Sequence, residues 1–147
     1  MDSTATIERS IVVAADRERV WRAITGPGQF MKWFGDPATD TLEFERLAAG
    51  EQMIFNHGGA TWHGTIATVE PPQRFAFYWP ATEDTPVQTL VSFYLEPVAE
   101  GTRITITEEG FDQLPEDERR TRFDQNSEGW EIQANNLAKY LQSQENA

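Results

Sequence analysis

The sequence contains no cysteine, which excludes disulfide bonds, thiolate metal sites and cysteine nucleophiles. Basic residues are also scarce: 12 Lys and Arg stand against 24 Asp and Glu, and the formal net charge is −12. A surface that follows nucleic-acid phosphates needs clustered Lys and Arg, so we expect no nucleic-acid partner. The longest unbroken apolar run, residues 11–15, is too short to span a bilayer.

The first residues carry neither the basic segment nor the apolar segment that a secretory signal peptide needs. We therefore expect a soluble, cytoplasmic protein. The chain has 147 residues with no internal repeat and no low-complexity linker, which predicts a single domain over 1–147. Five Trp, nine Phe and three Tyr are too many for a disordered segment and indicate a substantial core.

The N-terminal part predicts one strand followed by two short helices. Residues 7–15 are rich in β-branched side chains, as is typical of a strand. Asp16 follows at a position where its carboxylate can cap a helix, and apolar residues then recur at helical spacing. Gly26 ends that helix, and Pro27 can begin the next because the first helical position needs no backbone N–H.

From residue 41 to about 109 the sequence predicts a meander of strands separated by turn residues. The expected strands are 41–47, 51–57, 60–70, 74–79, 87–96 and 102–110. The Gly58–Gly59 pair predicts a two-residue hairpin loop, because both loop positions need a positive φ. Such a loop places Phe55 opposite Trp62 on one face of the sheet and His63 on the other.

The last segment predicts a long amphipathic helix. It begins near Pro115, and the acidic residues that follow suit a helix N-terminus. One apolar stripe recurs at alternating steps of four and three: Phe123, Ser127, Trp130, Ala134, Leu137 and Leu141. An antiparallel sheet with one apolar face needs a cover, and this helix is long enough to provide it. The pattern predicts an α+β fold with six to seven antiparallel strands.

Several short motifs, in this order, resemble one known family. They are VWRAIT, FMKWFG, VEPPQRFAFYW, VSFYLEPVAEGTRITIT and GWEIQANNLAKYL. Over roughly residues 7–142 the chain resembles the heat-shock-protein-90 ATPase activator homologue-like (AHSA-type) family of the START-like, polyketide-cyclase-like SRPBCC superfamily. One departure is Ala15–Asp16, where many relatives have Ala-Pro; Asp16 still caps the helix that follows.

The resemblance implies a helix-grip fold, in which a curved antiparallel sheet wraps around the C-terminal helix and an interior cavity. Members typically bind apolar small molecules there, and a minority are cyclases or hydrolases. We therefore expect a monomer or homodimer that binds an apolar or aromatic ligand, such as a lipid or an aromatic metabolite, without a cofactor. The family is named after a co-chaperone that carries this domain behind another one. Nothing in this sequence corresponds to that other domain, so a chaperone is not the expected partner.

Aromatic side chains from separate elements are the candidates for the cavity wall. They are Trp33, Phe34, Phe55, Trp62, Phe77, Trp79, Phe93 and Trp130. Such residues are often only core packing, but the resemblance favours a ligand pocket, which is concave and mostly apolar with a few polar groups. Asn126 and Gln133 flank the stripe of the final helix and are candidates for polar contacts with the ligand.

Few ionisable residues are candidates for chemistry in such a cavity. His57 and His63 have no third ligand at a suitable spacing, which favours surface imidazoles over a metal site. Glu108 shares its strand face with Ile104 and Ile106, so an inward-pointing face would desolvate it, as a general acid or base requires. The simpler expectation is that Glu108 reaches water at the strand end. We therefore assign no catalytic or metal-binding residue.

Two other functions stay open at this stage. A cyclase, dehydratase or hydrolase would act on the same ligand, through Glu108 or His63. A stress-response or chaperone-associated module would present the acidic stretch 108–118 to its partner. A solvated loop and helix start is the simpler interpretation of that stretch.

Overall fold

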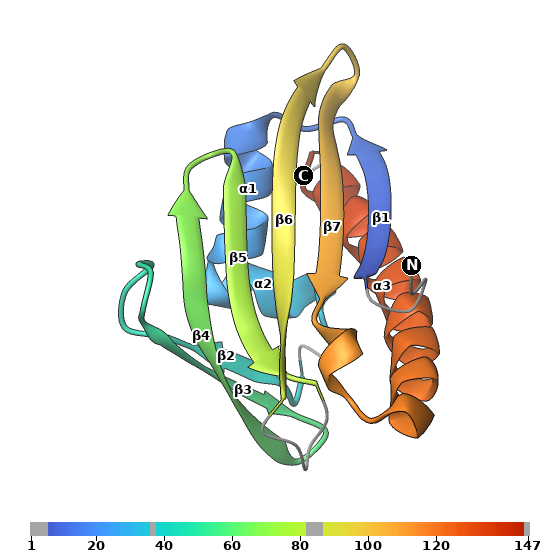
Figure 1. The fold of residues 1–147 in the computed structure, drawn as a ribbon. Coiled ribbons are helices and arrows are strands. Elements are labelled where there is room, and N and C mark those ends of the chain that lie inside the picture. Colours follow the sequence, from blue (N-terminus) through green and yellow to red (C-terminus); the bar gives the residue numbers. More distant parts are fainter. Residues whose placement is uncertain (1–5, 36–37, 82–86, 146–147) are drawn as a thin grey trace.

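The computed structural model describes residues 6–35, 38–81 and 87–145, without the side chains of Pro27, His57 and 143–145. Figure 1 shows the elements in chain order. They are β1 (Thr6–Val13), α1 (Arg17–Thr25), α2 (Pro27–Trp33), β2 (Thr41–Glu43), β3 (Gln52–His57), β4 (Ala60–Glu70), β5 (Arg74–Pro80), β6 (Gln88–Val98), β7 (Gly101–Glu109), the 3₁₀ turn η1 (Phe111–Gln113) and α3 (Glu116–Glu145).

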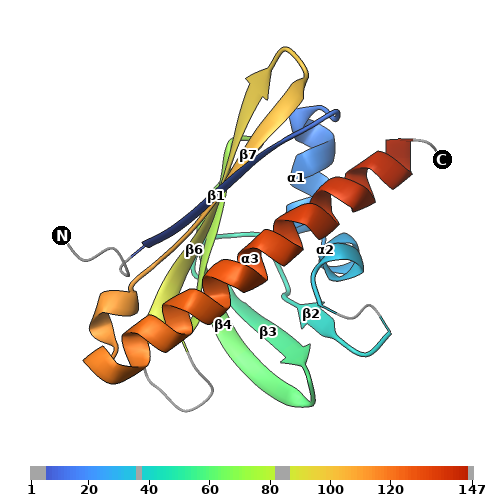
Figure 2. The ribbon, with the colours of Figure 1, turned by 90° about the vertical axis from the view of Figure 1, so that its right-hand side faces the viewer.

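The strands form one antiparallel sheet in the order β1-β7-β6-β5-β4-β3-β2. Strands β2 to β7 are therefore a meander, and β1 pairs with β7 at the far end of it. The long helix α3 lies across one face of this sheet, and α1 and α2 lie on the same side (Figure 2). This arrangement confirms the predicted α+β helix-grip fold.

The core lies between the inner face of the sheet and the helices. Side chains alternate along each strand, so one face collects the apolar residues. Those at most 3% exposed include Met53, Phe55, Ile66, Phe75, Phe77, Val91, Phe93, Ile104 and Ile106. The predicted stripe of α3 packs against this face, with its last four members buried and Phe123 and Ser127 half-buried.

The hairpin between β3 and β4 forms as predicted, whereas the strand before it is shorter. Gly58 and Gly59 have φ values of 60° and 84°, and Phe55 lies opposite Trp62. The strand expected over 41–47 ends at Glu43, opposite Ile54, because the chain then turns back, with the Ala48 N–H donating to the Arg46 carbonyl at 3.0 Å. In that turn the Gly50 N–H donates to the Ile66 carbonyl and the Ile66 N–H donates to the Glu51 carbonyl, both at 2.8 Å.

The Asp16 side chain caps α1, since its Oδ1 accepts the N–H of Arg19 at 2.8 Å. Replacing Asp16 by Ala leaves that N–H without its partner, and we expect the free energy of unfolding to fall by about 1 kcal/mol. Asp16→Asn should keep most of the stability, because an Asn oxygen caps as well. Urea denaturation measures both. Equal losses in the two variants would contradict a role limited to capping.

Candidate functional site

A cavity of about 270 Å³ lies between the inner face of the sheet and the middle of α3. Its apolar wall includes five of the predicted aromatic side chains: Phe34, Phe55, Trp62, Trp79 and Trp130. The helix α3 adds polar groups through Arg122, Gln125, Asn126 and Gln133, and it exposes backbone at Gly129. The cavity therefore has an aromatic sheet side and a more polar helix side.

Three other aromatic residues predicted for this wall lie elsewhere. Trp33, Phe77 and Phe93 are at most 2% exposed and are absent from the described lining of the cavity. The Phe93 ring centroid lies 6.3 Å from that of Trp33 and 6.4 Å from that of Phe77. They face inward as predicted, but they pack against one another in the core.

The carboxylate of Glu108 is fully buried beside the cavity wall. Glu108 continues the inward face of β7 after Ile104 and Ile106, and its cross-strand neighbours are Ile7 and Val91. The expectation that Glu108 reaches water is wrong, because α3 passes over this end of the strand and contacts the side chain. Glu108 is thus also unavailable as part of an acidic contact surface over 108–118.

Four uncharged side chains donate hydrogen bonds to the Glu108 carboxylate. Oε1 accepts from Trp130 Nε1 at 2.8 Å and from Asn126 Nδ2 at 3.2 Å. Oε2 accepts from Trp79 Nε1 at 2.9 Å and from Thr89 Oγ1 at 2.5 Å. A carboxylate can accept about four such bonds, so its acceptor sites are filled. The network joins β5, β6, β7 and α3 and fixes the orientation of three lining residues.

The aromatic rings of the wall also pack against one another. Trp79 and Trp130 stack with centroids 6.0 Å apart and an interplanar angle of 27°. Phe34 lies 5.9 Å from the Trp79 ring and 5.8 Å from the Trp130 ring. Phe55 lies 5.7 Å from Trp79. Together with the bonds to Glu108, these contacts hold the wall in one arrangement.

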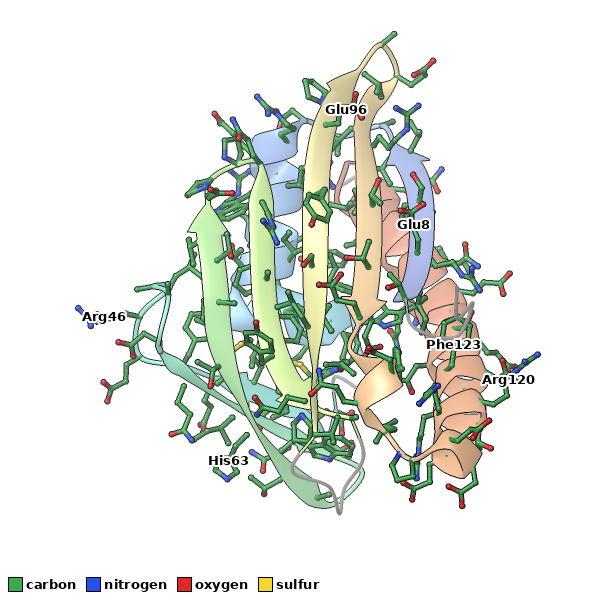
Figure 3. All side chains as sticks on the ribbon, viewed as in Figure 1. Glu8, Arg46, His63, Glu96, Arg120 and Phe123 are labelled. Atoms are coloured by element: carbon green, nitrogen blue, oxygen red, sulfur yellow. The ribbon has the colours of Figure 1, made fainter. Side chains whose placement is uncertain are left out.

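Neither predicted acid–base candidate lines the cavity. Glu108 lies behind Trp79 and Trp130, and His63 is exposed, with Nδ1 3.2 Å from Gln52 Nε2. Figure 3 shows His63 beside β3 and β4, on the side of the molecule away from α3. The side chain of His57 lies outside the described part of the chain. Over the described residues, no group of three or more metal-binding side chains occurs.

Several residues of the cavity lining and of the Glu108 network were not predicted from the sequence, although patterns for them exist. Thr89 precedes Val91 by two residues, so it points inward with it. Arg122 and Gly129 stand four residues before and three residues after Asn126, so all three share one face of α3. The helical period therefore places the polar side of the cavity once one of its members is known.

A helix long and apolar enough to cross a membrane is not found in the described part of the chain.

The fold and the site define a helix-grip protein with a cavity between its sheet and its C-terminal helix. Residues 14–142 match the family model described as "Activator of Hsp90 ATPase homolog 1-like protein", and the chain belongs to this family. The family assignment made from the sequence motifs is therefore confirmed. A search of curated proteins finds no match.

Solved structures share the fold. Protein MLL2253 from Mesorhizobium loti has a TM-score of 0.78 at 21% identity, covering 94% of this chain and 97% of that chain. DynU16, from the dynemicin biosynthetic locus, has a TM-score of 0.77 at 24% identity, covering 94% of this chain and 47% of that chain. This chain thus spans about half of DynU16. CalU16 from Micromonospora echinospora has a TM-score of 0.68 at 23% identity, covering 92% and 74%.

Proposed function

We propose that this protein binds a small molecule with an apolar or aromatic body in the cavity between the sheet and α3. The observation that carries the proposal is an aromatic wall held in place by the buried Glu108 network. Ligand pockets are usually apolar, with a few placed polar groups, and often span roughly 300–1,000 Å³. A cavity of about 270 Å³ favours a ligand of one or two rings.

The expected affinity follows from the apolar area that such a ligand buries. About 200 Å² at roughly 25 cal/mol/Å² corresponds to about 5 kcal/mol, and ring contacts add about 1 kcal/mol. Because the loss of translational and rotational freedom opposes these terms, they set the tightest expected dissociation constant, on the order of 10–100 μM. DynU16 belongs to a biosynthetic locus, which supports a small molecule rather than a protein as the ligand. An enzymatic role is not part of the proposal, because neither Glu108 nor His63 lines the cavity.

Gly129 provides a test that fills the cavity without disturbing its wall. It lines the cavity from the middle of α3, and a Cβ built there meets no atom within 4 Å. Leu also has a better helix propensity than Gly, by about 0.5–1 kcal/mol. We expect Gly129→Leu to fold normally and to bind 1-naphthylamine, a two-ring fluorophore that is neutral at pH 7, at least about tenfold more weakly than the wild type. Fluorescence titration measures this affinity.

The matched control is Asn135→Leu, which adds the same side chain on the exposed face of α3. This variant should bind the fluorophore as the wild type does. The proposal is refuted if the wild type binds neither the fluorophore nor any of the small benzyl compounds described below. Equal binding by wild type and Gly129→Leu would place the fluorophore site outside the cavity.

A further inference from the structure

The buried carboxylate turns the hydrogen-bond donors of the wall away from the cavity. Trp79 Nε1, Trp130 Nε1 and Asn126 Nδ2 all donate to Glu108, although all three residues line the cavity. Indole and amide nitrogens of this kind can only donate. The group that accepts from all three is the Glu108 carboxylate, which as an anion has acceptor oxygens and no donor. These two tryptophans therefore present ring carbons, and not their N–H groups, to the cavity.

Glu108 has no directly paired cation among the described residues; the half-buried cation on the neighbouring strand, Arg9, donates instead to Ser127 Oγ at 2.6 Å. The four hydrogen-bond partners of Glu108 are uncharged, and in the described part of the chain no Lys or Arg forms an ion pair with it. The donor dipoles point their positive ends at Glu108, so their negative ends lie toward the cavity. These dipoles weaken the field of the carboxylate without reversing its sign. Glu108 therefore contributes a negative potential at the inner wall of the cavity.

A positive group also lines the cavity, one helical turn from Asn126. Arg122 is the one charged side chain among the described lining residues; it is exposed and donates to Gln125 Oε1 at 3.4 Å. Trp130 is only 3% exposed. Arg122 is four residues from Asn126 and eight from Trp130, or about 6 Å and 12 Å along the helix at about 1.5 Å per residue. The positive group therefore lies exposed at one end of the α3 lining, and the buried carboxylate lies behind the middle of that lining.

We infer that the cavity selects a ligand whose buried part is cationic, an amine or a quaternary ammonium on an apolar body, seated against Trp79 and Trp130. This inference rests on the proposed binding function and specifies its ligand class. A unit charge about 6 Å from a carboxylate, at an effective dielectric constant of about 20, changes a binding constant by roughly a hundredfold. Aromatic rings favour the same charge when their faces meet it.

Three benzyl compounds with tetrahedral heads of different charge test the inference: benzyltrimethylammonium, neopentylbenzene and phenylmethanesulfonate. Displacement of the bound naphthylamine, or calorimetry, gives their affinities. In the wild type, the cation should bind at least about tenfold more tightly than the sulfonate. In Glu108→Gln, the cation should lose at least about tenfold in affinity, while neopentylbenzene should change by less than about threefold.

The control variant is Glu109→Gln, which makes the same change of charge at the exposed neighbouring residue. It should leave all three affinities unchanged. If neopentylbenzene binds but Glu108→Gln does not weaken the cation, the inference is overturned and the proposed function stands. If neither the naphthylamine nor any benzyl compound binds, the proposed function itself fails. If Glu108→Gln does not fold, the wild-type comparison decides, and a sulfonate that binds as tightly as the cation overturns the inference.

Discussion

Replacing Glu108 by Ala is expected to lower the free energy of unfolding by about 3–5 kcal/mol. The truncation removes the shared acceptor of four hydrogen bonds that come from two strands and α3. Each buried donor without a partner costs about 1–3 kcal/mol, and water that enters the space recovers part of that loss. Urea denaturation followed by tryptophan fluorescence measures the change.

The control for this experiment is Glu109→Ala, which removes a carboxylate from the exposed side of the same strand. A change within about 0.5 kcal/mol is expected there, as for other surface substitutions. Thr89→Val removes a single donor and should cost less than Glu108→Ala. If Glu108→Ala were as stable as Glu109→Ala, the network would not organise the cavity wall.

Phe93→Ala is the second substitution with a large expected effect, again a loss of about 3–5 kcal/mol in unfolding free energy. Phe93 is fully buried on β6, and its ring lies 6.0 Å from that of Trp130 and 6.5 Å from that of Phe75. The neighbouring rings can close only part of the space that the deletion leaves. Thermal and urea unfolding should both report the loss.

Binding should follow a different order from stability, because Phe93 is not in the described lining and Trp62 is. Trp62 is half-buried, so Trp62→Ala should cost roughly 1 kcal/mol of stability or less and weaken naphthylamine binding severalfold. The conservative Phe93→Leu should bind nearly as the wild type does. If Phe93→Leu weakened naphthylamine binding more than Trp62→Ala did, the ligand would not bind in the cavity that Trp62 lines.

Much of the fold could be predicted because its signals are local. Alternation along the strands, the Gly58–Gly59 loop and the Asp16 cap each depend on a few neighbouring residues. The strand expected over 41–47 was wrong beyond Glu43, because the chain turns over 44–51 instead of continuing along β3. Alternation alone does not show where pairing with the neighbouring strand stops.

The candidate site was harder to predict, for the same reason. Periodicity identifies the inner face of the sheet, but it does not say which inward rings the packed core covers and which border a cavity. Phe77 and Trp79 therefore look equivalent in sequence, although only Trp79 lines the cavity. For Glu108, the alternation along β7 predicts a buried side chain, whereas its position at the end of the strand predicts an exposed one. The side chain is buried because α3 passes over that end of the strand.

The indole N–H resonances of the five tryptophans report whether a ligand occupies the aromatic cavity, in a proton–nitrogen correlation spectrum recorded while the naphthylamine is added. Trp62, Trp79 and Trp130 line the cavity, whereas Trp33 lies in the core and Trp21 packs against the core from α1. We expect the first three resonances to shift with the bound fraction and the other two to stay in place. Equal shifts of all five, or shifts confined to Trp21 and Trp33, would contradict binding in this cavity.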